Sequence, residues 1–134
     1  MSTPEWIDPY VRERVAAEIA AAPQHRAWLE EQNGITLYGT IGHHAILRPD
    51  GSVWFYEVVN RPARPDTYQW RRAEGLERIG ALSLGLKRFP ELAALLPQRP
   101  RTAPDCPRCK GHGEIGGVVC PDCASLGWVP EGAA

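Results

Sequence analysis

The sequence predicts an α+β fold, in which a small antiparallel meander is packed by N-terminal and central helices and followed by a separate cysteine module. Three observations support this prediction. Apolar residues recur at helical spacing in residues 8–33, and β-branched and aromatic residues gather around a turn sequence in residues 35–60. All four cysteines lie between residues 106 and 123. We therefore expect a body with its own core and a short module of different character.

Two helices are expected in residues 8–33. Asp8 is a good N-cap, and Pro9 would then occupy the first helical position, where its missing N–H costs nothing. Pro23 breaks this helix and can start a second one from Gln24 to Gln32.

Residues 35–60 change to the alternation that is typical of strands, and we expect two or three antiparallel strands there. The best hairpin turn is Pro49–Ser52, whose sequence Pro-Asp-Gly-Ser is a strong turn signal. The residues from Val53 to Val59 are β-branched and aromatic, which favours a strand directly after this turn.

A stiff loop is expected at residues 61–65, because its two prolines disfavour both a strand ladder and a helix. Asp66 or Thr67 would cap the next helix, which we expect from Thr67 to Phe89 because apolar residues recur there at steps of three and four. A short helix from Glu91 to Leu96 would follow the proline at position 90.

These elements predict three parts of the chain. Residues 1–96 form the α+β body, residues 97–105 a linker rich in proline and arginine, and residues 106–130 the cysteine module. The body is long enough to bury a core of its own. The module is too short for this and needs a metal or disulfides.

The composition indicates a soluble globular chain, with 43% hydrophobic and 23% charged residues. No window approaches the roughly 18 apolar residues of a membrane helix. The first ten residues contain Glu5 and Asp8 but no basic residue, unlike a secretory signal. We therefore expect a cytoplasmic location and no membrane partner.

Charge is distributed unevenly along the chain, although the formal net charge is only -1. Residues 1–60 contain four basic and eight acidic residues, whereas residues 61–134 contain eleven basic and eight acidic ones. This asymmetry is compatible with a surface that faces a polyanion and also with an ordinary solvated helix face.

Two Cys-x-x-Cys pairs, separated by ten residues, are the most informative feature of the sequence. This spacing is the usual arrangement for a tetrahedral Zn²⁺ ion held by four thiolates, with no open position for water or substrate. The expected cofactor is one structural Zn²⁺ per chain, held by Cys106, Cys109, Cys120 and Cys123. Two disulfides or a redox-active pair are the alternatives. A reducing cytosol disfavours disulfides, and neither pair follows a strand and precedes a helix as thioredoxin-type chemistry requires.

The first pair continues as Cys-Pro-Arg-Cys-Lys-Gly-His-Gly over residues 106–113, which resembles the CxxCxGxG repeat of the DnaJ-type cysteine-rich zinc-finger domain. Residues 120–127 resemble a degenerate second repeat, with Ser125 in place of the first glycine. The resemblance covers residues 104–130 and implies a zinc-ribbon β-hairpin module that contacts protein or sometimes nucleic acid. The family's defining J domain is missing, because no His-Pro-Asp tripeptide occurs. Zinc bound within one chain is the simpler arrangement, and zinc shared in a dimer is the alternative.

The expected function is that of a zinc-binding, non-enzymatic adaptor or regulatory protein, in which the closed metal site is structural and the ribbon presents a protein-contact surface. No Gly-x-Ser-x-Gly elbow, phosphate-binding glycine loop or His-Glu-x-x-His motif occurs. Five residues are candidates for partner binding: Arg99, Arg101, Arg108, Lys110 and Trp128.

Two alternatives remain open. A nucleic-acid-binding regulator would use the basic segment 99–110, with Trp128 partly exposed for stacking on bases, but the net charge weighs against it. A small enzyme would use His43 or His44 with Glu57 across a hairpin. Neighbouring residues of a strand point to opposite faces, so the two histidines are not expected to serve one site. The sequence names neither a partner nor an oligomeric state.

Overall fold

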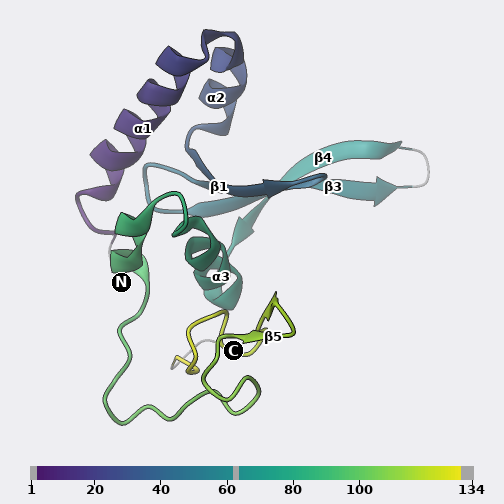
Figure 1. The fold of residues 1–134 in the computed structure, drawn as a ribbon. Coiled ribbons are helices and arrows are strands. Elements are labelled where there is room, and N and C mark those ends of the chain that lie inside the picture. Colours follow the sequence, from purple (N-terminus) through teal and green to yellow (C-terminus); the bar gives the residue numbers. More distant parts are fainter. Residues whose placement is uncertain (1–2, 62–63, 131–134) are drawn as a thin grey trace. The chain divides into compact units, whose positions relative to one another are not determined.

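The computed structural model describes residues 3–61 and 64–130, with residues 59–61 and 64–66 described by their backbone alone (Figure 1). The chain divides into two compact units, Met1–Ala73 and Glu74–Ala134, called here the N-terminal and C-terminal units. The α+β class is confirmed, with a four-stranded antiparallel sheet and helices. The predicted boundaries after residues 96 and 105 stay predictions.

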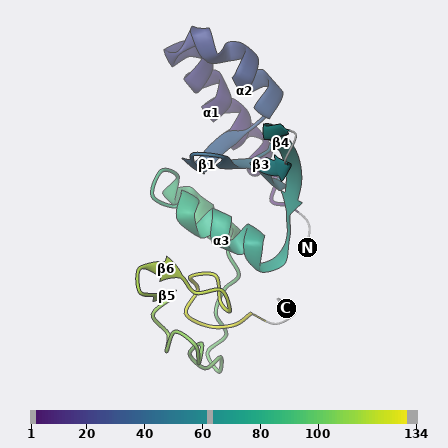
Figure 2. The same cartoon turned by 90° about the vertical axis from the view of Figure 1, so that its right-hand side faces the viewer.

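The N-terminal unit pairs a helical layer with the sheet, and both views place its helices on the same side of the strands (Figures 1 and 2). The helical layer consists of α1 (Ile7–Ala21), a 3-10 turn η1 (Pro23–His25) and α2 (Arg26–Gln32). The strands follow in chain order and in sheet order as β1 (Ile35–Thr40), β2 (His43–Leu47), β3 (Val53–Arg61) and β4 (Arg64–Ala73).

The first helix begins earlier than the sequence predicts, so the prediction of Asp8 as its N-cap is wrong. The Tyr10 N–H donates to the Trp6 carbonyl at 3.1 Å, and Trp6 is the N-cap. Asp8 lies in the first turn, where its carboxylate accepts a hydrogen bond from Arg12 Nε at 2.8 Å. Asp8 therefore takes part in an i,i+4 ion pair on the helix surface and does not cap the helix.

The predicted loop at residues 61–65 is wrong at Arg61, which ends β3, and at residues 64–65, which begin β4, whereas residues 62–63 lie outside the described residues. The predicted helix from Thr67 to Phe89 is wrong as far as Ala73. Residues 64–73 form β4, which pairs with β3 from Val53↔Ala73 to Arg61↔Arg64. β4 is an edge strand, and an edge strand tolerates proline where the missing N–H would point away from the neighbouring strand. Neither Asp66 nor Thr67 caps a helix, because both lie in this strand.

The core of the N-terminal unit follows the alternation of the strands. On β3, Val53 and Phe55 are buried, whereas Trp54 and Tyr56 on the opposite face are half-buried. The Trp28 ring of α2 lies against this second face, 5.1 Å from the Tyr56 ring centroid. Ten further apolar residues of the unit are fully or almost fully buried: Ile7, Val11, Leu29, Ile35, Leu37, Ala45, Ile46, Leu47, Pro49 and Ala73.

The C-terminal unit contains α3 (Gly75–Gly85), a 3-10 helix η2 (Pro90–Leu95) and a short hairpin of β5 (Glu114–Ile115) and β6 (Val118–Val119). The helix that was expected to reach Phe89 is therefore shorter, and the expected helix at Glu91 is a 3-10 helix that starts at the preceding proline. No described helix has the length and apolar character needed to cross a membrane.

Candidate metal centre

The four cysteine sulfurs converge in the C-terminal unit. All four Sγ atoms lie within 4.8 Å of one another. The separation is 3.9 Å between Cys106 and Cys120 and 3.6 Å between Cys109 and Cys123. Each cysteine is at most 4% exposed, and together they form a buried cluster with Leu126 packed against it. The pattern of the sequence therefore places four soft ligands in one buried location.

The two shorter separations, 3.6 and 3.9 Å, fit a tetrahedral metal ion. Four thiolates on zinc, each about 2.3 Å from the ion, stand about 3.8 Å apart. The observed 3.6 and 3.9 Å lie on either side of this value. A disulfide requires about 2.05 Å between sulfurs, and the four cysteines are free thiols here. The four residues could thus hold one metal ion.

The site is built from two backbone knuckles related by a shift of fourteen residues, the first at residues 106–113 and the second at residues 120–127. Each knuckle starts by donating a hydrogen bond to the end of the other: Cys106 N–H to Gly127 O at 2.7 Å, and Cys120 N–H to Gly113 O at 3.1 Å. In the central turn of the first knuckle, the His112 N–H donates to the Cys109 carbonyl. The second knuckle has the same hydrogen bond between the residues fourteen positions later. The two halves of the site are therefore a structural repeat.

A final glycine in each knuckle allows the two to approach closely. A methyl group at Gly113 would lie 2.8 Å from the carbonyl oxygen of Ser125, and one at Gly127 would lie 2.8 Å from the carbonyl oxygen of Gly111. Both glycines have positive φ, +82° and +84°. These positions need glycine for both steric and conformational reasons.

The second knuckle adopts the same backbone with less suitable residues. Lys110 and Ala124 are equivalent, with φ of 55° and 52°, and Gly111 and Ser125 have φ of 82° and 75°. Ser125 thus occupies a conformation that glycine adopts at lower cost. Ser125 therefore differs from the repeat in its residue type but not in its backbone conformation.

The electrostatics of the cluster oppose ionisation of all four thiols in the absence of a cation. Burial raises the pKa of the Cys123 thiol to about 12, together with hydrogen bonds from the neighbouring thiols. Burial also acts to raise the pKa of Cys109, but backbone N–H groups and the other thiols lower it to about 7. The Gly113 N–H lies 3.3 Å from Cys109 Sγ. A bound dication would supply the charge that four thiolates need.

The second knuckle packs against α3 through Ala124. The equivalent residue of the first knuckle, Lys110, is exposed. The Ser83 hydroxyl donates to the Ala124 carbonyl at 3.4 Å, and a methyl group at Gly80 would lie 3.7 Å from Ala124 Cβ. Ala124 is 4% exposed, while Lys110, its equivalent, is exposed. Figure 2 shows the cysteine segment beside α3.

The candidate partner-binding residues have different surroundings. Arg99 Nη2 donates to Asp105 at 2.7 Å and to the Ala103 carbonyl at 3.0 Å. Arg108 Nη1 lies 3.4 Å from Oδ1 of Asp122, the equivalent residue of the second knuckle. Arg101 and Lys110 are exposed. The partial exposure expected of Trp128 is wrong, because this residue is only 6% exposed.

The histidine pair lies in the N-terminal unit, and its residues point to opposite faces as expected. Nδ1 of His43 lies 3.2 Å from Glu57 Oε2. The His44 ring lies on the other face, where a methyl group at Gly39 would be 2.5 Å from its Nδ1. The structure therefore brings His43 and Glu57 together and separates His44 from them.

Comparisons with protein-family models, curated proteins and solved structures found no match to this chain. The resemblance to the DnaJ-type domain therefore stays a prediction that rests on residues 106–127. The geometry of the cysteine cluster is independent of that resemblance.

Proposed function

We propose that the C-terminal cysteines bind one structural Zn²⁺ ion as a zinc ribbon, and that the chain works as an adaptor or regulatory protein. The observation that carries this proposal is the set of four buried sulfurs within 4.8 Å, at separations suited to a tetrahedral ion. The two Cys-x-x-Cys turns and their resemblance to DnaJ-type repeats support zinc in particular.

A structural role follows from the ligand set. Four thiolates complete a tetrahedral shell, so neither water nor substrate has a position on the ion. Thiolate ligands in tetrahedral geometry select zinc or iron. The segment between the cysteines has only two short strands, and its buried cluster consists of the cysteines themselves. The ion would therefore supply the folding energy that an apolar core supplies elsewhere.

A protein-contact role is supported by the hairpin that joins the two knuckles. Its apolar residues Ile115 and Val118 face each other across the strands and are 43% and 68% exposed. The preceding knuckle adds exposed Lys110 and His112. Exposed apolar side chains rimmed by polar ones are typical of interaction surfaces.

The metal is tested on the full chain purified without added metal. Elemental analysis should find one zinc per chain, and four thiols should become reactive only after chelation. Iron in place of zinc, or no metal with oxidised cysteines, would overturn the proposed site.

The contact role is tested separately in a pull-down with two matched variants. Val118→Ser should keep zinc and lose binding partners, whereas Ile41→Ser should keep both, because Ile41 is an exposed apolar residue of the N-terminal unit. Equal capture by both variants would remove the hairpin as the contact element.

A further inference from the structure

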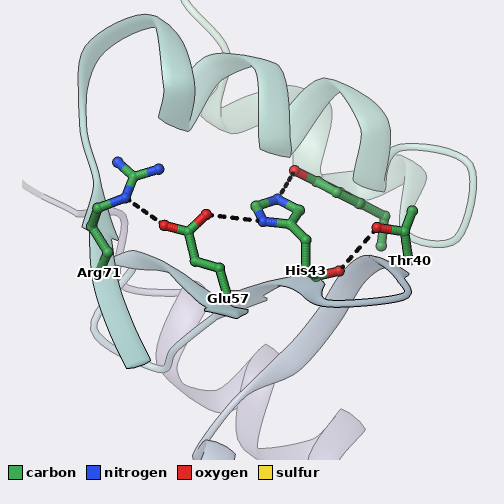
Figure 3. Close-up of polar contacts among 5 residues, drawn as sticks. Thr40, His43, Glu57 and Arg71 are labelled. Atoms are coloured by element: carbon green, nitrogen blue, oxygen red, sulfur yellow. Dashed lines mark hydrogen bonds and ion pairs between the residues drawn. The ribbon is translucent and has the colours of Figure 1, made fainter. Parts of the chain in front are cut away.

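A row of four polar side chains in the N-terminal unit has the geometry of a nucleophile, a base and a positioned carboxylate (Figure 3). The Tyr38 hydroxyl lies 2.8 Å from His43 Nε2. The other ring nitrogen of His43 lies 3.2 Å from Glu57 Oε2. Arg71 Nε donates to Glu57 Oε1 at 2.7 Å. This order of groups is the arrangement by which proteins activate a hydroxyl for attack.

A β-bulge brings Tyr38 into this row. Strict alternation from the pair Thr36↔Ile46 would place Tyr38 opposite His44. The register instead shifts between Thr36 and Tyr38, so that Tyr38 pairs with Ala45 and shares a sheet face with His43. Bulges often re-aim a side chain beside a functional site. The opposed pair His43↔Glu57 completes the row on the same face.

The row fixes the direction of proton transfer. A carboxylate only accepts hydrogen bonds, so Glu57 selects the tautomer of His43 that carries its proton on Nδ1. Nε2 is then an acceptor that faces the Tyr38 hydroxyl. The hydrogen bond from Arg71 lowers the pKa of Glu57 and so keeps it ionised.

The side chains of the row are partly exposed. The side chains of His43 and Glu57 are 29% and 25% exposed, and that of Arg71 is 42% exposed. Tyr38 is half-buried. The other tyrosines have aromatic surroundings: the Tyr10 ring packs on Trp6, and the rings of Tyr56 and Tyr68 stack at 4.7 Å.

We propose that Tyr38 is a nucleophile that accepts an acyl group from an activated carboxylic ester, with His43 as its base and Glu57 as a positioning residue. A bond forms between the Tyr38 phenolic oxygen and the carbonyl carbon of the ester. The bond from that carbon to the leaving oxygen breaks, and the electron pair departs with the leaving group. The phenolic proton passes to His43 Nε2. The products are O-acyl-Tyr38 and the free alkoxide or phenolate.

The test uses p-nitrophenyl acetate with the full, metal-loaded chain. Released p-nitrophenolate gives the rate, and mass spectrometry of peptides locates the acetyl group. Tyr38 should be acetylated at least tenfold faster than Tyr68, although Tyr68 is the more exposed of the two. Equal or slower acetylation of Tyr38 would overturn the proposal without any variant.

Variants separate the roles within the row. Tyr38→Phe should remove the modified peptide. His43→Asn should slow acetylation of Tyr38 at least tenfold, because a general base contributes factors of this size or more. His44→Asn, its matched neighbour on the opposite face, should leave the rate unchanged.

Glu57→Gln should slow the acetylation of Tyr38 threefold to tenfold, while the acetylation of Tyr68 stays constant. This ratio distinguishes positioning from a general loosening of the fold, which would speed both reactions. A variant of His43 or Glu57 that folds and leaves the Tyr38 rate unchanged would overturn the proposed relay.

Discussion

The N-terminal unit and the cysteine segment of the C-terminal unit bury different kinds of side chain. The N-terminal unit buries aliphatic and aromatic residues of its strands and helices, including Ile46, Leu47 and Phe55. The cysteine segment of the C-terminal unit buries its four metal-binding candidates, with Leu126 packed against them. One region thus has an apolar core, whereas the other has a cluster of thiols where a core would be.

This difference predicts two independent sources of stability. Apolar burial stabilises the sheet whether or not a metal is present. A short segment without such a core needs an ion, and structural zinc sites supply roughly 10–16 kcal/mol in small peptides near neutral pH. Changes at the sulfurs should therefore affect the cysteine segment, and changes at the strands should affect the N-terminal unit.

The largest effect is expected for the double variant Cys106→Ser and Cys120→Ser, which removes one ligand from each knuckle. Metal should be lost, and trypsin should cleave rapidly after Arg108 and Lys110, because proteolysis follows the population of the open form. His112→Ser changes an exposed residue of the same knuckle and should keep the metal and the resistance. Equal resistance of the two proteins would contradict metal-dependent folding.

A core substitution in the sheet should destabilise the N-terminal unit and leave metal binding unchanged. Ile46 is fully buried, and Ile46→Ala should reduce the free energy of unfolding of the N-terminal unit by about 2–5 kcal/mol through the cavity it leaves. Zinc content should not change. Ile41→Ala is the control, because Ile41 is exposed and its loss should be nearly neutral in a urea titration.

The equivalence of the knuckles is tested at their final glycines. Gly113→Ala and Gly127→Ala should each reduce stability of the metal site by about 1–3 kcal/mol or more, since both meet a carbonyl at 2.8 Å and both have positive φ. Gly116→Ala has positive φ but no atom within 4 Å, and should cost less. Competition with a chromogenic chelator measures all three. A large difference between the stability losses of Gly113→Ala and Gly127→Ala would contradict the equivalence of the two knuckles.

A smaller effect of opposite sign is expected at the residue that departs from the repeat. Ser125→Gly should stabilise the second knuckle by about 1 kcal/mol, because glycine adopts a φ of 75° without strain. The reverse change, Gly111→Ser, should destabilise the first knuckle, where a Cβ would also lie 2.8 Å from Asp105 Cγ. Thermal unfolding of the metal-loaded chain compares them.

The smallest effect is a dependence of the sheet on pH. The hydrogen bond from Arg71 lowers the pKa of Glu57 in the folded state below its ordinary value of 4.5. Its contribution is therefore fully present above pH 4.5 and is lost as pH falls through the lowered value. The pair is partly exposed, so the contribution is at most about 1 kcal/mol. In urea titrations, the free energy of unfolding of the wild type should exceed that of Glu57→Gln above pH 4.5, and this difference should disappear on acidification.

The convergence of the four cysteines could be predicted from sequence, because it is determined by residues that lie close together along the chain. Each Cys-x-x-Cys pair sets its own turn, and the ten intervening residues suffice to bring the pairs together. The hairpin at Pro49–Ser52 was predictable for the same reason. The class of the fold followed from these local patterns.

The errors arise where distant pairing decides the structure. The prediction of a loop and a helix at β4 is wrong because it treats proline as incompatible with a strand, whereas β4 contains Pro65 and lies at the edge of the sheet. The sequence does not reveal Tyr38 and Arg71, because their place beside His43 and Glu57 depends on a bulge and on the register of four strands. A spacing in sequence does not contain that information.

Amide hydrogen exchange before and after chelation would show whether the cysteine segment alone depends on a metal, because it reports on each unit separately in the intact chain. Chelation should abolish protection at Cys106, Cys120 and Ala124, whose N–H groups bond between or within the knuckles, and should leave the amides of β2 and β3 protected. Unchanged protection in the knuckles after complete removal of metal, or loss of protection in both units together, would contradict this prediction.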